Sequence, residues 1–353
     1  MKIKSIYVEN FRGYKQRFFE FKDKMNLIVG NNASGKTSLL EALYFCMCGK
    51  SFKSRDIDAI NFDSFYFKLE MLAEVGDTEY NVFCYVDKAL DKRIMINDKK
   101  IKKLSELIST FKFVFFEPDA TELIKHQPKL RRRFLDMEVT KLYPYMTKVY
   151  SEYHRALLSR NAFLKSYDKK DIIDVYDMQI SQLGFLIFQK RQEVINKLSI
   201  EAQKIFSLVF ENKSMLELKY MPSIAASTEK EYYKEIKKNI EKDLSLGYTT
   251  KGVHRDDFEI LIDKKPAINF ASEGQIKLAA VSVVLATSLL YSEPVLILDD
   301  VFSELDSFKR KNLVKFISQY QSFVTSAEDL SVLEREEILE FGSANLIFLE
   351  RSM

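Results

Sequence analysis

Residues 25–38 read MNLIVGNNASGKTS, and this stretch decides the fold. Residues 30–37 fit the pattern G-x-x-x-x-G-K-[ST] of a phosphate-binding loop. The largely apolar run 25–29 before the loop is typical of a buried strand, and the run 38–46 after it is typical of a helix. A glycine-rich turn between such a strand and such a helix indicates an α/β protein that binds a nucleotide.

The loop has a physical reason to bind phosphate. Two glycines let successive backbone N–H groups face one anion at a helix N-terminus, where the helix dipole adds partial positive charge. We expect Lys36 to neutralise the charge of the β- and γ-phosphates and the Thr37 hydroxyl to bind Mg²⁺. The other predicted nucleotide contacts are the remaining members of the loop, Gly30, Asn31, Asn32, Ala33, Ser34, Gly35 and Ser38. An accidental glycine turn is the alternative, and the strand and helix on either side argue against it.

A second motif lies near the end of the chain, where residues 294–306 read PVLILDDVFSELD. Four consecutive apolar residues, 295–298, predict a strand buried on both faces, with Asp299 at its carboxyl end. We expect Asp299 to be the water-mediated partner of Mg²⁺, and Asp300 to act as a general base or to position the attacking water. A strand that ends in solvated acids is the alternative. The interval from residue 37 to residue 299 is too long for a small GTPase or a nucleotide kinase.

A third segment, residues 270–278, reads FASEGQIKL and precedes an apolar helix that we expect to reach Tyr291. Ser272 is a natural N-cap, and Gly274 leaves backbone N–H groups open at the start of the helix, so this is a second anion site. Two phosphate sites in one chain are useful if they meet. We therefore expect a head-to-tail homodimer, in which Ser272, Gly274 and Gln275 reach the nucleotide held by the other subunit. An ordinary capped helix is an equally good interpretation of this segment alone.

Composition excludes several classes of protein. The chain has 353 residues, of which 46% are hydrophobic, but it has only 10 Gly and 6 Pro, so loop-rich, collagen-like and low-complexity chains are excluded. Three cysteines cannot build a disulfide framework, and no Cys/His spacing matches a zinc site. With no signal-peptide pattern and no apolar run long enough to span a bilayer, we expect a soluble cytoplasmic protein without a membrane partner.

The pattern along the chain predicts an α/β domain with an inserted, mainly helical domain. We expect residues 1–121 and 246–353 to form the first and residues 122–245 the second, with an almost unbroken helical pattern over 122–210. The net charge of 54 − 51 = +3 is too small to indicate a partner. Residues 122–170, however, carry twelve Lys/Arg against five Asp/Glu, so the helical domain begins with a basic segment.

Together, the motifs resemble a known family. The S-x-G-Q element, the acidic strand and the Ser303-Glu304-Leu305-Asp306 that follows are similar to the signature, Walker B and D-loop motifs of ABC-type ATPases related to SMC and Rad50. Within that group the chain resembles the RecF family of bacterial recombination mediators. The matching stretches run in family order from residue 3 to about residue 325, and include Ile6-x-Val8-x-Asn10-Phe11-Arg12-x-Tyr14, residues 36–42, residues 116–119, residues 128–136 and residues 252–257.

The resemblance implies an ABC-type ATPase head with mixed sheets. It also implies ATP and Mg²⁺ as cofactors, a weak DNA-stimulated ATPase, a homodimer when ATP is bound, and DNA as a partner, at gaps or at junctions of single and double strands. RecR and RecO would be further partners, and RecA loading the outcome. Arg12 is similar to an arginine that contacts the nucleotide in relatives. Departures concern hydrolysis and dimerisation: Ile276 and Lys277 follow Gln275 where the family usually has Gln-Arg, and Thr325-Ser326 stands where many ABC ATPases carry a switch histidine.

Two segments give weaker signals. Lys129, Arg131, Arg132 and Arg133 could meet a DNA backbone, because adjacent cations release counterions when they bind phosphates; a solvated helical face is the alternative. The His254-Arg255-Asp256 tripeptide copies part of a kinase catalytic loop, but Leu261 stands where the kinase asparagine is required. These residues are expected to approach nucleotide or DNA, or to form a structural ion pair.

The leading hypothesis is therefore a RecF-like ATPase of DNA repair and recombination. One alternative is an ABC-type ATPase coupled to a nuclease or defence system. Another is a DNA-binding module that senses ATP with negligible hydrolysis, which the altered signature makes conceivable.

Overall fold

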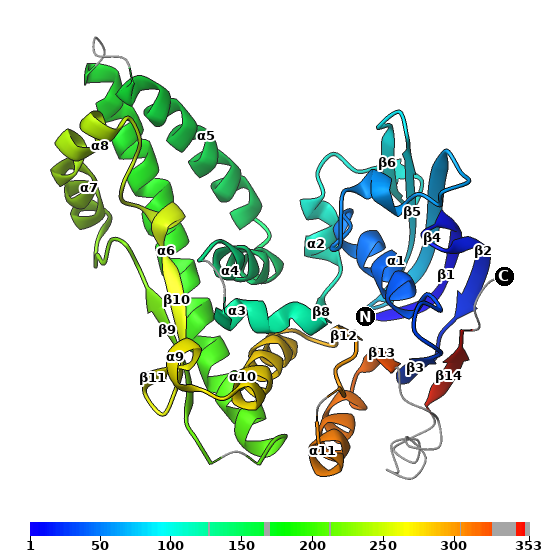
Figure 1. The fold of residues 1–353 in the computed structure, drawn as a ribbon. Helices are drawn as coiled ribbons and strands as arrows, with labels where there is room; N and C mark the ends of the chain where they lie inside the picture. Colours follow the sequence, from blue (N-terminus) through cyan, green and yellow to red (C-terminus); the bar gives the residue numbers. More distant parts are fainter. Residues whose placement is uncertain (126–127, 166–169, 212, 304, 327–343, 350–353) are drawn as a thin grey trace. The chain divides into compact units, whose positions relative to one another are not determined.

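The computed structural model describes residues 1–349, apart from 126–127, 166–169, 212, 304 and 327–343. The chain divides into two compact units, and each is described by itself (Figure 1). Unit 1 comprises residues 1–121, 204–213 and 273–353, and unit 2 comprises residues 122–203 and 214–272. The return of the chain to the first domain was expected at residue 246. Unit 2 instead extends to residue 272, because residues 257–262 pair with residues 216–221 of the same unit.

Unit 1 contains a parallel sheet with the strand order β14-β3-β13-β12-β8. Its strands are β3 (Met25–Val29), β8 (Phe113–Phe116), β12 (Val295–Leu298), β13 (Gln321–Ser326) and β14 (Asn345–Phe348). β3 and β12 are buried along their whole length, as expected for apolar runs with both faces covered. Because the strands are parallel, the carboxyl ends of β3, β13 and β12 meet at one edge of the sheet.

Unit 1 also contains an antiparallel sheet with the order β2-β1-β4-β5-β6-β7. Its strands are β1 (Lys2–Phe11), β2 (Tyr14–Glu20), β4 (Tyr66–Val75), β5 (Thr78–Asp87), β6 (Lys92–Ile96) and β7 (Lys99–Lys100). β4 alternates buried and partly exposed residues, which is the pattern of a strand with one face on the core. The sheet therefore presents one apolar face to a neighbouring layer.

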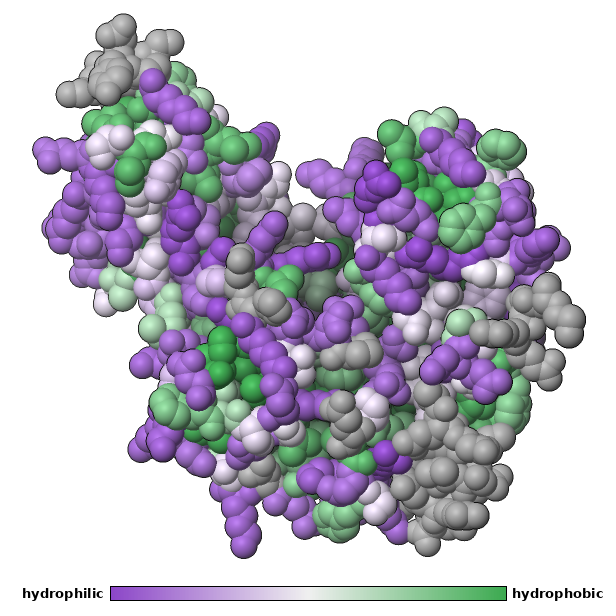
Figure 2. Space-filling view, viewed as in Figure 1, coloured by the Kyte–Doolittle hydropathy of each residue, from purple (hydrophilic) through white to green (hydrophobic). Residues whose placement is uncertain are grey.

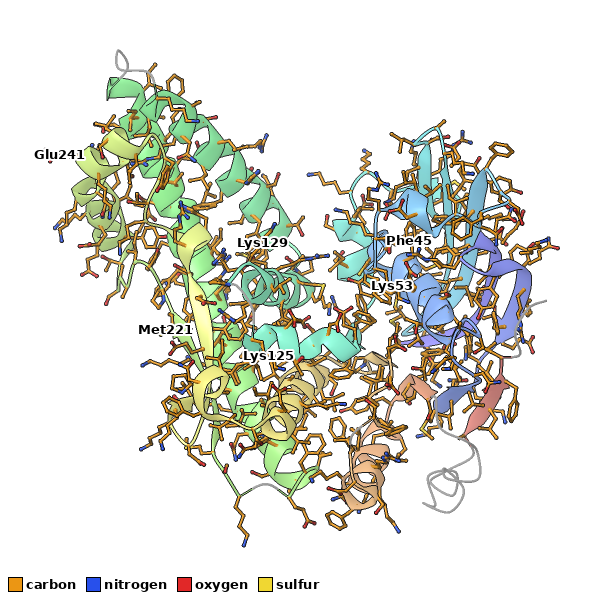
Figure 3. All side chains as sticks on the ribbon, in the orientation of Figure 1. Phe45, Lys53, Lys125, Lys129, Met221 and Glu241 are labelled. Carbon is orange, nitrogen blue, oxygen red and sulfur yellow. The ribbon has the colours of Figure 1, made fainter. Side chains whose placement is uncertain are left out.

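Helix α1 (Lys36–Cys48) fills the space between these two sheets. It contacts β1, β4 and β5 of the antiparallel sheet and β12 and β13 of the parallel sheet. Residues 39–48 are all buried, because a helix between two apolar layers has no solvent face. Phe45 of this helix, labelled in Figure 3, meets Phe11 and Phe67 edge to face. The helix that follows the phosphate-binding loop is thus held on both sides by the core.

Further helices complete unit 1. They are η1 (Asp56–Ala59), α2 (Ser105–Thr110), η2 (Pro118–Thr121), α10 (Glu273–Ala286), η4 (Thr287–Leu290) and α11 (Ser307–Ile317). Of the described residues, the window 273–290 is long and apolar enough to cross a membrane by length and composition. However, 67% of this window is buried inside the structure, as in the core helix of a globular protein. The face seen in Figure 2 is covered mainly by hydrophilic side chains.

Unit 2 is mainly helical, as predicted from the pattern over 122–210. Its helices are α3 (Glu122–Lys125), α4 (Pro128–Leu142), α5 (Met146–Leu164), α6 (Lys170–Leu208), α7 (Glu229–Lys238), α8 (Ile240–Leu246), η3 (Val253–Arg255) and α9 (Ala267–Phe270). The last residues of α6 count with unit 1. A small antiparallel sheet, β11-β10-β9, was not predicted; its strands are β9 (Leu216–Met221), β10 (Asp257–Ile262) and β11 (Lys265–Pro266).

A fully buried arginine ties the helices of unit 2 together. Arg160 on α5 donates to Asp177 on α6 (2.6 Å) and to Asp243 on α8 (2.7 Å), and it also donates to the Thr249 hydroxyl (2.8 Å). The two carboxylates compensate the buried guanidinium, which would otherwise be costly to remove from water. Part of the positive charge that the sequence shows in residues 122–170 is therefore internal.

Candidate nucleotide-binding site

The phosphate-binding loop connects β3 to α1, as its position in the sequence predicts. Gly35 has a φ of 100°, and a Cβ placed on it would lie 2.8 Å from the Tyr14 hydroxyl oxygen, so both backbone conformation and space require glycine there. The Lys36 ammonium donates to the carbonyl oxygens of Gly30 (2.5 Å) and Asn31 (3.0 Å). The lysine therefore closes the loop across its own backbone.

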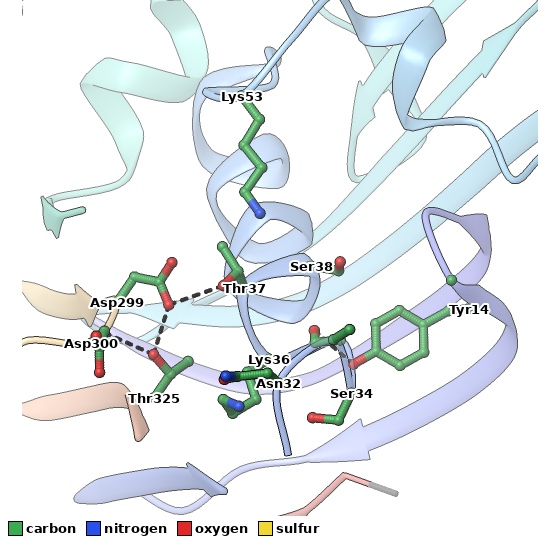
Figure 4. Close-up of a pocket in the computed structure, with 13 residues that line it drawn as sticks. Tyr14, Asn32, Ser34, Lys36, Thr37, Ser38, Lys53, Asp299, Asp300 and Thr325 are labelled. Carbon is green, nitrogen blue, oxygen red and sulfur yellow. Dashed lines mark hydrogen bonds between the residues drawn. The ribbon is translucent and has the colours of Figure 1, made fainter. Parts of the chain in front are cut away.

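A pocket of about 600 Å³ opens above this loop (Figure 4). Its lining includes nine of the predicted site residues: Asn32, Ala33, Ser34, Gly35, Lys36, Thr37, Ser38, Asp299 and Asp300. It also includes four residues that sequence reasoning did not assign to the site: Gly13, Tyr14, Lys53 and Thr325. The predicted residues Arg12, Gly30, Asn31, Ser272, Gly274 and Gln275 are not among the described residues that line it.

The acidic motif meets the loop at the edge of the parallel sheet. Asp299 follows β12, and its Oδ1 accepts a hydrogen bond from the Thr37 hydroxyl (3.2 Å) and another from the Thr325 hydroxyl (2.6 Å). Thr325 takes part because β13 lies between β3 and β12, so that its carboxyl end separates the two motifs. The signal that could have identified it is the position of Thr325-Ser326, where many ABC ATPases carry a switch histidine.

The charged groups of the pocket influence one another. Burial lowers the pKa of Lys36, and the negative charges of Asp299 and Asp300 partly offset that effect. Burial is also the main cause that raises the pKa of Asp300, with the neighbouring Asp299 adding to it, while Ser303, Lys277 and Lys36 act in the opposite direction. A polyanion bound here would stabilise charged Lys36, and its negative charge would raise the pKa of Asp300 further.

The donor set suits a hard cation such as Mg²⁺. The Thr37 hydroxyl and the Asp299 carboxylate supply oxygen ligands within hydrogen-bond distance of each other. The described residues contain no group of three or more His, Cys, Asp or Glu that could hold a metal by themselves. Mg²⁺ commonly takes one or two protein oxygens and completes its shell with phosphate and water, so the residues present fit that ion.

Arg12, which the resemblance implied as a nucleotide contact, is not among the described residues that line the pocket. Its guanidinium makes a bidentate ion pair with Glu41 of α1 (2.7 and 2.9 Å) and also donates to the Asp58 carbonyl and the Ser54 hydroxyl. Glu41 is fully buried, and it also accepts from Ser51 (2.6 Å). Arg12 thus joins the first strand to the helix of the phosphate-binding loop and to the segment that carries Lys53. In Figure 4, Lys53 extends toward Thr37.

The signature segment lies at the N-terminus of α10. Ser272 and Gly274 are exposed, and Gln275 is half-buried. A Cβ built on Gly274 meets nothing within 4 Å, so nothing in the described chain requires glycine at that helical position. Lys277, one of the departures from the family pattern, donates to the Ser303 carbonyl (2.5 Å) and hydroxyl (2.9 Å), just beyond Asp300. Of the predicted D-loop, Glu304 lies outside the described residues, and Asp306 caps α11 by accepting from the Lys309 amide.

The basic cluster divides into two halves. Arg131 forms a bidentate ion pair with Asp257 (2.7 and 2.8 Å), and Arg132 donates to the Asp256 carbonyl (2.7 Å), because α4 packs on β10. Burial lowers the pKa of Arg132. Lys129 (Figure 3) and Arg133 are exposed. Two of the four cations predicted to bind DNA are therefore engaged in the packing of unit 2.

His254 is held inside unit 2. Its Nε2 lies 3.0 Å from the Thr249 carbonyl oxygen, which can only accept, so the Nδ1 accepts from the Tyr153 hydroxyl at 2.8 Å. Burial is the main cause that lowers the pKa of His254 to about 4. Asp256 is bound by the Tyr220 hydroxyl and the Ser223 amide. These contacts favour the structural interpretation of the His254-Arg255-Asp256 segment over a nucleotide or DNA contact.

Comparison with known proteins agrees with this geometry. Residues 2–343 match the family model for the RecF/RecN/SMC N-terminal domain. The DNA replication and repair protein RecF of Clostridium beijerinckii is 34% identical, covering 98% of this chain and 97% of that protein. RecF of Clostridium botulinum strain Okra is 35% identical, with 92% of each chain covered.

Solved structures show the same fold. The recombination mediator protein RecF with ATP, in the RecFOR pathway, superimposes with a TM-score of 0.85 at 30% identity, covering 93% of this chain and 92% of that one. The Smc head domain of Pyrococcus furiosus, bound to the C-terminal domain of ScpA, gives a TM-score of 0.59 at 18% identity, which supports the fold alone. The predicted ABC-type ATPase head fold related to SMC is confirmed.

Proposed function

The chain belongs to the RecF family of DNA replication and repair proteins, within the RecF/RecN/SMC group, and on that premise we propose that it binds and slowly hydrolyses ATP to control its assembly on DNA. One observation carries the proposal. The Thr37 hydroxyl donates to the Asp299 carboxylate, so two motifs 262 residues apart in sequence meet in one pocket with Lys36. Such convergence of a phosphate-binding loop, a hydroxyl and a carboxylate is what the binding of a nucleotide with its cation requires.

In this proposal each side chain has a distinct task. The backbone of residues 31–35 and the Lys36 ammonium bind the β- and γ-phosphates. Thr37 and Asp299 hold Mg²⁺, which when bound neutralises charge on the phosphate oxygens. Asp300 orients a water for attack on the γ-phosphorus and accepts its proton; the bond to the β–γ bridging oxygen breaks, and ADP and phosphate leave. The raised pKa of Asp300 suits a proton acceptor better than an ordinary aspartate does.

We propose further that the second half of the site comes from another copy of the chain. Ser272 and Gly274 are exposed at a helix N-terminus, where backbone N–H groups and the dipole favour an anion. Gly274 has no steric need to be glycine within the described chain, whereas a nucleotide that approaches the backbone from outside would supply that need. ATP would then join two subunits, and loss of the γ-phosphate would release them.

DNA is the proposed partner of the dimer. The exposed cations Lys129 and Arg133 are the members of the predicted cluster that remain for phosphate contacts. From the family we further propose that the protein acts in the cytoplasm at gaps or strand junctions, with RecR and RecO as partners and RecA loading as the outcome.

The test is DNA-dependent ATP turnover measured together with molecular mass by light scattering. The wild type should dimerise with ATP and hydrolyse it faster on gapped DNA. Lys36→Met should lose both nucleotide binding and turnover. Asp300→Asn should keep binding and dimerisation but lose turnover by roughly 100-fold or more, since a positioned base contributes about that much. If the wild type dimerises with ATP but shows no turnover under any condition, the ATPase hypothesis is wrong, and the protein is instead a DNA-binding module that senses ATP.

A further inference from the structure

Thr325 connects the two acidic residues of the site through a single hydroxyl oxygen. Thr325 Oγ1 donates to Asp299 Oδ1 (2.6 Å) and accepts from the backbone N–H of Asp300 (2.8 Å), as the dashed lines of Figure 4 show. The direction of both bonds is fixed, because an N–H can only donate and the hydroxyl has one proton. That proton must point at Asp299, so Thr325 holds Asp299 Oδ1 as the acceptor of this bond.

The hydrogen bond from the Asp300 N–H to Thr325 fixes the backbone just after β12, where the backbone pairing of the parallel sheet ends. On one side, the Asp299 N–H donates to the carbonyl of Phe116, the last residue of β8 (2.9 Å). On the other side, the Asp300 N–H, which would next pair with β13, is bound by the Thr325 side chain instead. The two residues are thus fixed from both neighbouring strands.

Asp300 needs such a constraint. Its φ is 51°, in the left-handed region that residues other than glycine rarely adopt. Such conformations persist where surrounding contacts hold them. Thr325 can supply one because only 1% of it is exposed, and a hydroxyl so buried keeps its hydrogen bonds. Its branched Cβ also restricts χ1, which keeps the oxygen directed at the turn.

We infer that Thr325 is a positioning residue, which fixes Asp299 Oδ1 beside Thr37 for the cation and holds the turn that directs Asp300 at the γ-phosphate. Thr325 touches no reacting atom in this scheme and acts through the two aspartates. The inference rests on the proposed ATP-binding function and adds a third strand, β13, to the two that carry the recognised motifs.

The test compares Thr325→Val, which keeps the shape and removes both hydrogen bonds, with Thr325→Ser, which keeps the hydroxyl. The matched control is Ser322→Ala, which removes another buried hydroxyl from β13; among the described residues Ser322 Oγ has no hydrogen-bond partner. Three quantities are measured: the affinity for a fluorescent ATP analogue with and without Mg²⁺, kcat and KM for ATP, and the melting temperature.

Thr325→Val should bind the analogue without Mg²⁺ within about threefold of the wild type, but should require at least tenfold more Mg²⁺ for tight binding. Its kcat should fall by about 100-fold with little change in KM, because the ground-state phosphate contacts of the loop are untouched. Thr325→Ser and Ser322→Ala should stay within about threefold of the wild type in every measurement. If Thr325→Val does not fold, as its melting curve will show, Thr325→Ala is measured in its place with the same expectations.

The outcomes separate this inference from the proposed function. A wild type that does not bind ATP would overturn both. A wild type that binds ATP with Mg²⁺, together with a folded Thr325→Val or Thr325→Ala that matches it in Mg²⁺ requirement and kcat, would overturn the role of Thr325 alone. If the wild type binds but does not hydrolyse ATP, the Mg²⁺ requirement for binding still decides the matter, because it is measured without turnover.

Discussion

Arg12 and Glu41 form a bidentate ion pair. Glu41 lies on α1, five residues after the lysine of the phosphate-binding loop, and its side chain is fully buried. The resemblance implies a nucleotide contact for Arg12, and Glu41 belongs to the matching stretch 36–42 without a role of its own. The structure gives the two residues a shared task, because Glu41 has no compensating cation other than Arg12 among its described contacts. The pair attaches the loop helix to the end of β1.

We predict from this pair that Arg12→Ala lowers the free energy of unfolding by about 3 kcal/mol, since it leaves a buried carboxylate without its cation. Urea denaturation measures this change. The matched control is Arg55→Ala, which removes an exposed ion pair with Asp58 and should leave the free energy of unfolding nearly unchanged, because exposed pairs contribute little. Unchanged stability of Arg12→Ala, combined with lost ATP affinity, would instead support the direct contact implied by the resemblance.

The two halves of the basic cluster should respond differently to charge reversal. Arg133→Glu should weaken DNA binding and reduce the slope of log affinity against log salt by about one, with the melting temperature unchanged. Arg131→Glu should destabilise unit 2, because Glu would face Asp257 at the position of a bidentate ion pair. Fluorescence anisotropy over a salt series and thermal melting distinguish the two effects. Equal DNA affinity of Arg133→Glu and the wild type would exclude this face as the DNA surface.

Local signals were enough to predict the nucleotide pocket in outline. The spacing of residues 30–38, and the apolar strands before this loop and before the acids 299–300, predict both motifs. The structure brings residues 32–38 and the two acids into one pocket. The class of the fold follows from the same strands and helices. These features are local in sequence, or follow from the rule that the carboxyl ends of parallel strands share an edge.

What sequence reasoning missed depends on the order of the strands, which no local pattern encodes. Thr325 enters the site because β13 is placed between β3 and β12. Arg131 is not available to DNA because it forms an ion pair with Asp257, which lies 126 residues later in the chain, at the start of β10. β10 was not predicted, because its residues were assigned to the second part of the α/β domain, whereas they form a ladder with β9 of unit 2. A cation looks the same in sequence whether its partner is a solvated anion, a buried aspartate or DNA.

Substitution of Gly274 should affect the free energy of unfolding and ATP-dependent dimerisation in opposite directions. Gly274→Ala should raise the free energy of unfolding by about 0.5–1 kcal/mol, because alanine is the better helix former and nothing in the described chain opposes a Cβ there. The same change should weaken ATP-dependent dimerisation if a nucleotide on another subunit approaches that backbone. Ser272→Arg should prevent dimerisation more completely while ATP binding to the single chain survives. Light scattering with ATP, beside urea denaturation, reports both; normal dimers in both variants would rule out the shared site.

The half-buried His254 predicts a loss of stability in mild acid. Its pKa in the folded protein is about 4, below the ordinary value near 6.5 expected in the unfolded chain. Between these values the unfolded state binds more protons, so stability falls as the pH is lowered from 7, and by pH 5 this histidine accounts for about 2 kcal/mol.

His254→Gln, which can still accept from Tyr153 and donate to Thr249, should flatten that part of the profile. His154→Gln, at an exposed histidine, should leave the profile unchanged. Urea denaturation at pH 7, 6 and 5 provides the comparison, and an equally steep loss of stability in His254→Gln would assign the acid sensitivity to other groups.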